Sequence, residues 1–267
     1  MRVLTWNLWW RFGPWQERQP SILAELNRVS PDIALLQEVW AVDGDDQADH
    51  LASDLGFHLA RTATPDGKPQ EFGNAIISRW PVQHLETIYL PGVDHKPSRR
   101  TAMLCLVDAP VAPVLAIVTH LTWEYNYSDV REAQLQAIVD LAVRHQVAGL
   151  DNATLVLAGD LNATPDSTEI ARLTGRAKPY SRDLVFTDSW AAVSDEPGHT
   201  WDRENPHRVD SQWPRRRLDY VLVGWPRPKP LGNPLSAELV GVDPLHGVVP
   251  SDHYGVLVGL DSRPPVR

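Results

Sequence analysis

Short apolar runs that end in polar residues recur along this chain, and they constrain its fold more than any other feature. In residues 154 to 164, TLVLAGDLNAT, the apolar part is typical of a buried strand, and Gly159 permits a sharp change of direction at its end. Side chains two positions apart on a strand point the same way, so Asp160 and Asn162 are predicted to face one crevice. Taken alone, these two residues are also ordinary turn formers before Thr-Pro.

The predicted elements alternate at first and then become mostly strands. A strand at 1–7 precedes a helix at 20–32 that stops at Pro31, a buried strand at 32–38 and a short helix at 46–57 closed by Gly56. Strand-like runs separated by Pro, Gly and Asp then suggest antiparallel pairing, at 72–79, 82–90, 100–107 and 114–120. The longest helix is expected at 128–147, and later strands at 154–160, 217–223 and 253–260.

The bulk properties indicate a folded globular protein. No break separates the halves of the 267 residues, so we expect one domain, 1–267. The hydrophobic share of 43% and the charged share of 22% exclude the disordered class. Because no apolar run approaches the roughly 20 residues that cross a bilayer, we expect no integral membrane association. The opening MRVLTWNLWW lacks the pattern of a secretory signal, which predicts a cytoplasmic protein, and we expect a monomer.

Cysteine content and charge restrict the possible ligands. Cys105 is the single cysteine, so a metal would need oxygen or nitrogen ligands. The net charge of -9 opposes broad, nonspecific attraction to a phosphate polymer. Arg99-Arg100 and Arg215-Arg216-Arg217 could form local basic patches, although charge runs are often solvated faces.

Polar side chains at the ends of different strands are expected to meet at one site, because clefts in such folds gather at strand ends. Asn7 could instead cap a turn, and His120 could be a satisfied core histidine. Glu38 is harder to explain structurally, because an unpaired buried carboxylate is costly and implies a metal or a cation. The set consists of Asn7, Glu38, His120, Asp160, Asn162, Asp219, Asp252 and His253.

The residue types of this set favour a phosphate-ester site. Asn, Glu and Asp oxygens without thiolates suit Mg²⁺ or Mn²⁺, and an ion held by one or two carboxylates leaves room for water and phosphate. A histidine with a buried Asp partner can act as acid or base near neutral pH, which predicts that Asp219 orients His253.

Ordered segments across the chain resemble the endonuclease/exonuclease/phosphatase superfamily, which includes deoxyribonuclease I, exonuclease III and the neutral sphingomyelinases. The segments are TWN, LLQEV, GNAIISR, VTHL, GDLNATPDS, RLDYVLV and SDHYGVLV, spanning Asn7 to His253. The resemblance implies an α+β fold, a four-layer α/β/β/α sandwich with two mixed, mainly antiparallel sheets. It also implies hydrolysis of a phosphate ester with a divalent cation, usually Mg²⁺, with Mn²⁺ as a substitute.

The resemblance also implies roles for individual residues. Glu38 would be the principal metal ligand, with Asn7 and Asp252 close by. Asp160 would activate the attacking water, and Asn162 would hold a phosphate oxygen. The remaining predicted members are His253 paired with Asp219 for phosphate contact or proton transfer, His120 as a catalytic histidine with Glu71 the nearest acidic candidate for its partner, and Arg100 as a phosphate-binding residue.

Three functions are compatible with these predictions. The first is a metal-dependent phosphodiesterase or nuclease with DNA or RNA as substrate, and the second is a phosphatase of a small phosphorylated metabolite or a lipid headgroup. The third is a non-catalytic binding protein on the same fold. The long segment from Trp190 to Pro214 is predicted to shape the binding surface, because it is too long for a simple connector.

Overall fold

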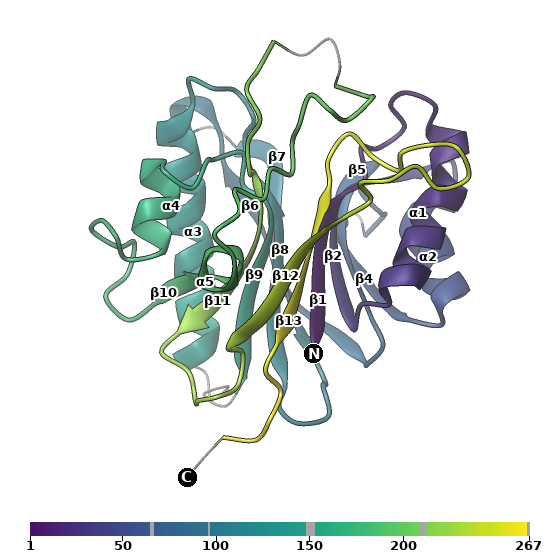
Figure 1. Cartoon of the computed structure of the whole chain (residues 1–267). Coiled ribbons are helices and arrows are strands. Elements are labelled where there is room, and N and C mark those ends of the chain that lie inside the picture. The colour runs from purple at the N-terminus through teal and green to yellow at the C-terminus, as the bar shows by residue number, and fades with distance from the viewer. Residues whose placement is uncertain (65–66, 96, 148–152, 209–211, 266–267) are drawn as a thin grey trace.

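The computed structural model describes residues 1–64, 67–95, 97–147, 153–208 and 212–265. Two β-sheets lie face to face, and helices cover their outer faces (Figure 1). The helices α1 (Trp15–Val29) and α2 (Gln47–Leu55) cover one sheet, while α3 (Ser128–Val147) and α4 (Thr168–Leu173) cover the other. This arrangement confirms the predicted four-layer α+β sandwich.

The first sheet has the strand order β12-β13-β1-β2-β5-β4, and β3 pairs with β2. Its central pair, β1 and β2, is parallel, and the other pairs are antiparallel. The strands are β1 (Arg2–Asn7), β2 (Ile33–Val42), β3 (Asp45–Asp46), β4 (His58–Arg61), β5 (Phe72–Ser78), β12 (Pro234–Val240) and β13 (Gly255–Leu260).

The second sheet has the order β10-β11-β9-β8-β7-β6, with β8 and β9 as its parallel pair. Its strands are β6 (Val82–Pro91), β7 (Pro97–Val107), β8 (Val114–His120), β9 (Thr154–Asp160), β10 (Val185–Asp188) and β11 (Asp219–Trp225), and two short helices, η1 (Val93–His95) and α5 (Ser189–Val193), complete the elements. The four runs expected to pair with one another divide between the sheets, because β5 pairs with β2 and β4.

The alternation of side chains along the strands creates three apolar layers. One layer lies between the sheets, and the other two lie under the helices on either side. Val118 of β8, Ala158 of β9 and Val221 of β11 belong to the layer between the sheets. One further step of the same alternation leads to His120, Asp160 and Asp219, so the polar site continues the inter-sheet layer at its edge.

Local differences from the predicted elements have physical causes. α1 begins at Trp15, so Pro20 lies inside the helix rather than at its start, at the cost of one backbone donor. β2 continues past Glu38 to Val42 because an irregularity between Leu36 and Val39 lets the strand resume. Among the described residues, no helix is both long and apolar enough to cross a membrane.

Candidate active site

The predicted site residues come together at one edge of both sheets, where the parallel strands end. All of them except Asn7 and Asp219 line one cleft of about 910 Å³. Asn7 and Asp219 are buried behind it, with 1% and 0% of their surfaces exposed. The loop between α5 and β11 forms part of the cleft wall, including Trp201, His207, Arg208 and Trp213. Positions 209–211 of the predicted Trp190–Pro214 segment lie outside the described residues.

Asp160 occupies the centre of the site at the end of β9. One oxygen, Oδ2, accepts a hydrogen bond from Asn7 Nδ2 at 3.2 Å. The other, Oδ1, accepts one from the backbone N–H of Asn162 at 3.0 Å. Burial, and then the charge of Asp219, raise the pKa of Asp160 to about 6. The carboxylate is therefore ionised at neutral pH, yet basic enough to accept a proton.

Gly159 is required where β8 and β9 pass each other just before the site. A Cβ atom at this position would lie 1.9 Å from the carbonyl oxygen of Thr119, the residue opposite it in the parallel pair. Because this contact is far closer than any side chain allows, glycine brings His120 and Asp160 side by side on neighbouring strands.

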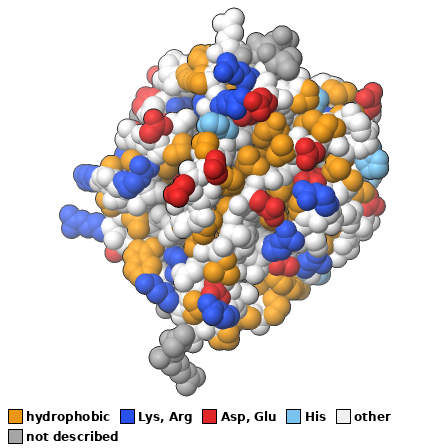
Figure 2. Space-filling view, viewed as in Figure 1, with side chains coloured by type: hydrophobic (Ala, Val, Ile, Leu, Met, Phe, Trp, Pro, Cys, Tyr) orange, Lys and Arg blue, Asp and Glu red, His pale blue; other side chains and the backbone are white. Residues whose placement is uncertain are grey.

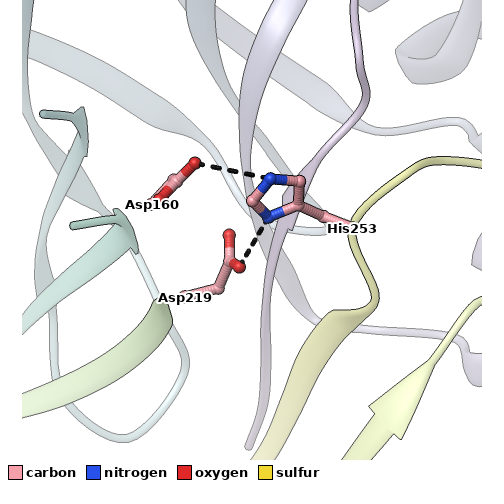
Figure 3. Close-up of side chains that lie close together, drawn as sticks. All are labelled: Asp160, Asp219 and His253. Atoms are coloured by element: carbon pink, nitrogen blue, oxygen red, sulfur yellow. Dashed lines mark hydrogen bonds and ion pairs between the residues drawn. The ribbon is translucent and has the colours of Figure 1, made fainter. Parts of the chain in front are cut away.

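His253 reaches Asp160 from the other sheet (Figure 3). Its Nδ1 lies 2.8 Å from Asp219 Oδ2, and its Nε2 lies 3.8 Å from Asp160 Oδ2. Burial alone would lower the pKa of His253, but the charges of Asp219 and Asp160 outweigh it and raise the pKa to about 10. At neutral pH the ring is an imidazolium that donates from both nitrogens, which favours charge stabilisation over proton abstraction.

Glu38 enters the site through an irregular backbone. Its φ is 53°, in the left-handed region that a non-glycine residue rarely adopts. Regular alternation would turn Glu38 away from the face that Gln37 occupies, whereas here Glu38 Oε1 accepts a hydrogen bond from Asn7 Nδ2 at 3.1 Å. Burial, and then the charge of Asp252, raise the pKa of Glu38 to about 7.

The oxygens of Glu38 and Asp252 fit a divalent cation. Glu38 Oε2 and Asp252 Oδ1 are both buried without a hydrogen-bond partner. Burial also raises the pKa of Asp252, so the carboxylates carry an electrostatic cost that a hard cation would offset. Asn7, also predicted as a ligand, turns its amide nitrogen toward the carboxylates, and its Oδ1 accepts the Trp9 amide at 2.9 Å.

A second group of potential ligands is less suitable for a cation. Asp160, Asp219 and His253 offer atoms within 4.8 Å of one another. His253 Nδ1 and Asp219 Oδ2 are already bonded to each other, which leaves Asp219 Oδ1 as the buried oxygen without a partner, and an imidazolium has no lone pair for a metal. We therefore favour the Glu38 side of the cleft.

His120 has two acidic neighbours, and Glu71, the nearest acidic candidate in the sequence, is neither of them. Its Nε2 lies 3.4 Å from Asp160 Oδ2, and its Nδ1 lies 3.8 Å from Glu38 Oε1. Burial, and then the charges of Arg100 and His253, hold the pKa of His120 well below its usual value. The ring is neutral, so these contacts are not ion pairs at neutral pH. The Glu71 backbone oxygen instead accepts the Trp10 indole N–H.

The remaining predicted residues lie on the cleft walls. Asn162 adopts a left-handed φ of 49°, which asparagine tolerates, and its Nδ2 donates to Leu121 O at 3.1 Å. Arg100 lines the main cleft and an adjoining hollow of about 290 Å³, whereas Arg99 lines only the hollow. The geometry thus separates the two neighbouring arginines.

Arg216, which the sequence marked only as part of a possible basic patch, lies between two aromatic rings. The guanidinium of Arg216 lies 4.5 Å from the ring centre of Tyr125 and 4.7 Å from that of Trp201. Its neighbours in the run differ, since Arg215 contacts Asp202 and Glu204 while Arg217 pairs with Asp188. The tryptophans near this run were the only sequence signal for an aromatic contact with an arginine. Tyr125 is distant in sequence, and only the tertiary fold brings it to Arg216.

The described residues form no broad basic face on the side of the molecule shown in Figure 2. Acidic and basic side chains are interspersed on the side of the molecule in Figure 2. The arginines that line the cleft, Arg100, Arg208 and Arg216, therefore supply positive charge locally against a net charge of -9.

Comparisons with known proteins agree with this architecture. Residues 4–253 match the Endonuclease/Exonuclease/phosphatase family. Tyrosyl-DNA phosphodiesterase 2 of Gallus gallus is 26% identical over 97% of this chain, which spans 66% of that relative's length. A crystal structure of D. rerio TDP2 with a single-strand DNA product has a TM-score of 0.75 at 18% identity, covering 98% of both chains. The human Nocturnin catalytic domain with bound sulfate has a TM-score of 0.69 at 20% identity, covering 98% of this chain and 94% of that one.

Proposed function

Because the chain belongs to the endonuclease/exonuclease/phosphatase family, we propose that it is a divalent-metal-dependent phosphodiesterase acting on nucleic acid. The observation that carries this proposal is the position of Asp160, which meets Asn7, His120 and His253 at the base of an arginine-lined cleft. A carboxylate that can accept a proton lies there beside donors suited to a phosphate oxygen.

In the proposed reaction, Asp160 orients a water molecule for in-line attack on phosphorus and accepts its proton, while the bond from phosphorus to the leaving ester oxygen breaks and that oxygen takes up a proton from solvent. The His253 imidazolium, held by Asp219, donates to a phosphate oxygen where negative charge develops. Asn162 Nδ2 and Arg100 supply further donors from the walls. His120, neutral and in contact with Asp160, helps to hold the carboxylate in place.

Glu38 and Asp252 would hold the cation, which we propose to be Mg²⁺, with Mn²⁺ as a substitute. When bound, such an ion neutralises charge on the phosphate. Asn7 fixes Glu38 and Asp160 relative to each other by donating to both. We keep the monomer and the cytoplasmic compartment as predictions.

The shape of the cleft favours a phosphodiester over a monoester. The main cleft adjoins the hollow beyond Arg100 and His120 on one side. On another side it adjoins a cavity of about 860 Å³ that shares Tyr125 and Arg216 with it. A phosphate at Asp160 would thus have room for an ester group on each side, and exposed aromatic rings such as Trp123 offer surfaces for stacking bases.

The names of the similar proteins support nucleic acid as the substrate. One relative is a tyrosyl-DNA phosphodiesterase, and one structure of similar fold contains a single-strand DNA product. Because this chain is acidic overall, we expect binding through few phosphates and therefore a shallow dependence of affinity on salt.

The test compares Mg²⁺-dependent hydrolysis of bis(4-nitrophenyl) phosphate and 4-nitrophenyl phosphate by the wild type and Asp160→Asn. We expect the diester to be preferred, EDTA to abolish the reaction, and the variant to lose about 10²- to 10⁴-fold in rate. Asp140→Asn, an exposed change on α3, is the matched control and should retain the wild-type rate. Full activity of Asp160→Asn would refute the assigned role.

The two alternative functions are outcomes of the same assay when single-stranded DNA is added as a third substrate. A preference for the monoester would shift the substrate to a small phosphorylated metabolite or a lipid headgroup. Absence of hydrolysis with both esters and with single-stranded DNA would favour the non-catalytic binding protein.

A further inference from the structure

The guanidinium of Arg18 binds the backbone of the loop of residues 8–12, which follows β1. Arg18 of α1 is 0% exposed, and its terminal nitrogens lie 2.8–3.0 Å from five carbonyl oxygens. Carbonyl dipoles that point at one spot repel one another unless a cation lies between them, and bonds from an ionised donor are the stronger kind. The oxygens are those of Leu8, Trp9, Trp10, Phe12 and Pro250.

The loop adopts a backbone that needs such support. Trp9 has a φ of 57° and Trp10 a φ of 34°, both in the left-handed region. This region is strained for a residue that is not glycine. The Trp9 ring also lies 4.8 Å from the Arg18 guanidinium, an additional cation–π contact that secures this arrangement.

Two backbone N–H groups of the same loop hold Asn7 and Glu38 in place. The Trp9 N–H donates to Asn7 Oδ1 at 2.9 Å, which turns Asn7 Nδ2 toward Glu38 and Asp160. The Trp10 N–H donates to the Glu38 carbonyl at 2.9 Å, at the point where the β2 backbone is left-handed. The shape of the loop therefore sets the position of Glu38.

Arg18 also reaches the segment that carries the other acidic residue. Pro250, whose carbonyl it binds, is followed by Ser251 and Asp252. Ser251 Oγ donates to the Asn7 carbonyl at 2.6 Å, which joins this segment to the end of β1. One side chain thus binds both the loop that follows β1 and the segment that leads to Asp252.

We propose that Arg18 is a positioning residue of the divalent-cation site, setting Glu38 and Asp252 relative to each other through these backbone contacts. This inference rests on the proposed function, because it concerns the cation that the hydrolysis uses. Arg18 touches neither substrate nor cation in this role.

The test is Mn²⁺ binding, measured by calorimetry and by electron paramagnetic resonance, for the wild type and Arg18→Lys. Lysine keeps the charge but has one nitrogen with three donors, which cannot reach all five oxygens. We expect the Kd for Mn²⁺ to rise about 10- to 100-fold, as when other groups that orient metal ligands are removed. The kcat on bis(4-nitrophenyl) phosphate should recover toward the wild-type value at saturating Mn²⁺.

Arg227→Lys is the matched control for loss of a loop-binding guanidinium. Arg227 donates to the carbonyls of Gly224 and Leu231 at the opposite edge of the sheets. We expect a lower Tm with an unchanged Kd for Mn²⁺. The inference is overturned if Arg18→Lys binds Mn²⁺ like the wild type, or if Arg227→Lys weakens binding equally.

A second variant keeps the inference testable if Arg18→Lys does not fold. Gly13 is exposed with a φ of 57°, and a Cβ there would lie 2.6 Å from the Trp9 ring. Gly13→Ala should displace the loop while leaving the core intact, and weaken Mn²⁺ binding about fivefold, which corresponds to roughly 1 kcal/mol. An unchanged Kd in this variant would overturn the inference.

Failure of the proposed function gives a different result. A wild type that binds Mn²⁺ but hydrolyses none of the esters or DNA would refute the hydrolase, while the Kd comparison would still decide the role of Arg18. A wild type that binds no divalent cation would refute both.

Discussion

The two parallel strand pairs at the centres of the sheets deliver polar side chains to the same site by different means. In β8 and β9, His120 lies opposite Asp160, and regular alternation turns both toward the cleft. In β1 and β2, Asn7 lies opposite Gln37, which hydrogen-bonds to Thr5 instead. Glu38 reaches the cleft through a left-handed residue and an adjoining loop, so one half relies on regular pairing and the other on a locally irregular backbone.

This contrast predicts different weaknesses in the two halves. The β8 and β9 half should be sensitive to any atom inserted between its strands, because its geometry is the geometry of the sheet. The β1 and β2 half should be sensitive to charge and to loop shape, because buried carboxylates and left-handed residues oppose its conformation.

The largest expected effect is on the regular half, from Gly159→Ala. The added Cβ would overlap the Thr119 carbonyl at 1.9 Å, so the strands must separate. We expect a loss of about 3 kcal/mol in the free energy of unfolding, at the upper end of overpacking effects. Urea denaturation followed by circular dichroism measures this loss.

Gly56→Ala is the control for the backbone contribution. Gly56 ends α2 with a φ of 66°, and no atom lies within 4 Å of its added Cβ. It should therefore cost only about 1 kcal/mol, the price of a left-handed alanine. Equal losses in the two variants would contradict the assigned role of the strand contact.

A smaller effect of opposite sign is expected in the irregular half, from Glu38→Gln in EDTA. Burial raises the pKa of Glu38 to about 7, so the ionised side chain destabilises the metal-free fold at and above that pH. Glutamine keeps the acceptor for Asn7 without the charge. Near pH 8 we expect the free energy of unfolding to rise by about 2 kcal/mol, which thermal denaturation would show as a Tm increase of several degrees. We also expect the variant to bind Mg²⁺ more weakly.

Glu71→Gln, an exposed change, serves as the control for loss of a carboxylate and should leave the Tm unchanged. A lower Tm for Glu38→Gln in EDTA would mean that the Glu38 charge is already compensated by protein groups.

The smallest effect is the pH dependence of stabilisation by Mg²⁺. The folded-state pKa values of Glu38, about 7, and Asp160, about 6, lie above their ordinary values, so both carboxyls favour the fold when protonated. In EDTA their contribution to stability is greatest below about pH 4 and is lost as the pH rises through 6 to 7. Protons and Mg²⁺ compete, so Mg²⁺ should add about 1 kcal/mol more near pH 8 than near pH 5.5. A Mg²⁺-induced Tm shift that is equal at both pH values would contradict this linkage.

Residues that follow regular alternation could be predicted from the sequence. Apolar runs located β1, β8 and β9, and the polar residue at each end followed from strand geometry. The predicted pairing of His253 with Asp219 also matches their 2.8 Å contact. Both residues lie at strand ends, Asp219 at the start of β11 and His253 shortly before β13.

Residues that depend on local irregularity could not be predicted in the same way. Residue spacing gives no information on backbone φ, so the left-handed conformation of Glu38, which breaks the alternation of β2, could not be predicted. For the same reason β2 was expected to end at Glu38. Arg18 sits in a helix where an arginine ordinarily faces solvent. Its partners are main-chain oxygens, which leave no pattern in the residue types.

The Asn7 amide, which joins Glu38 in one sheet to Asp160 in the other, makes turnover sensitive to sliding between the sheets. Apolar surfaces tolerate a small slip, because their attraction has no direction, whereas two hydrogen bonds from one nitrogen do not. A population in which the sheets had shifted slightly would keep its strands and its far-ultraviolet spectrum and lose its chemistry. Enzyme rate would then serve as a ruler for the alignment of the two halves, finer than any spectroscopic measure of secondary structure.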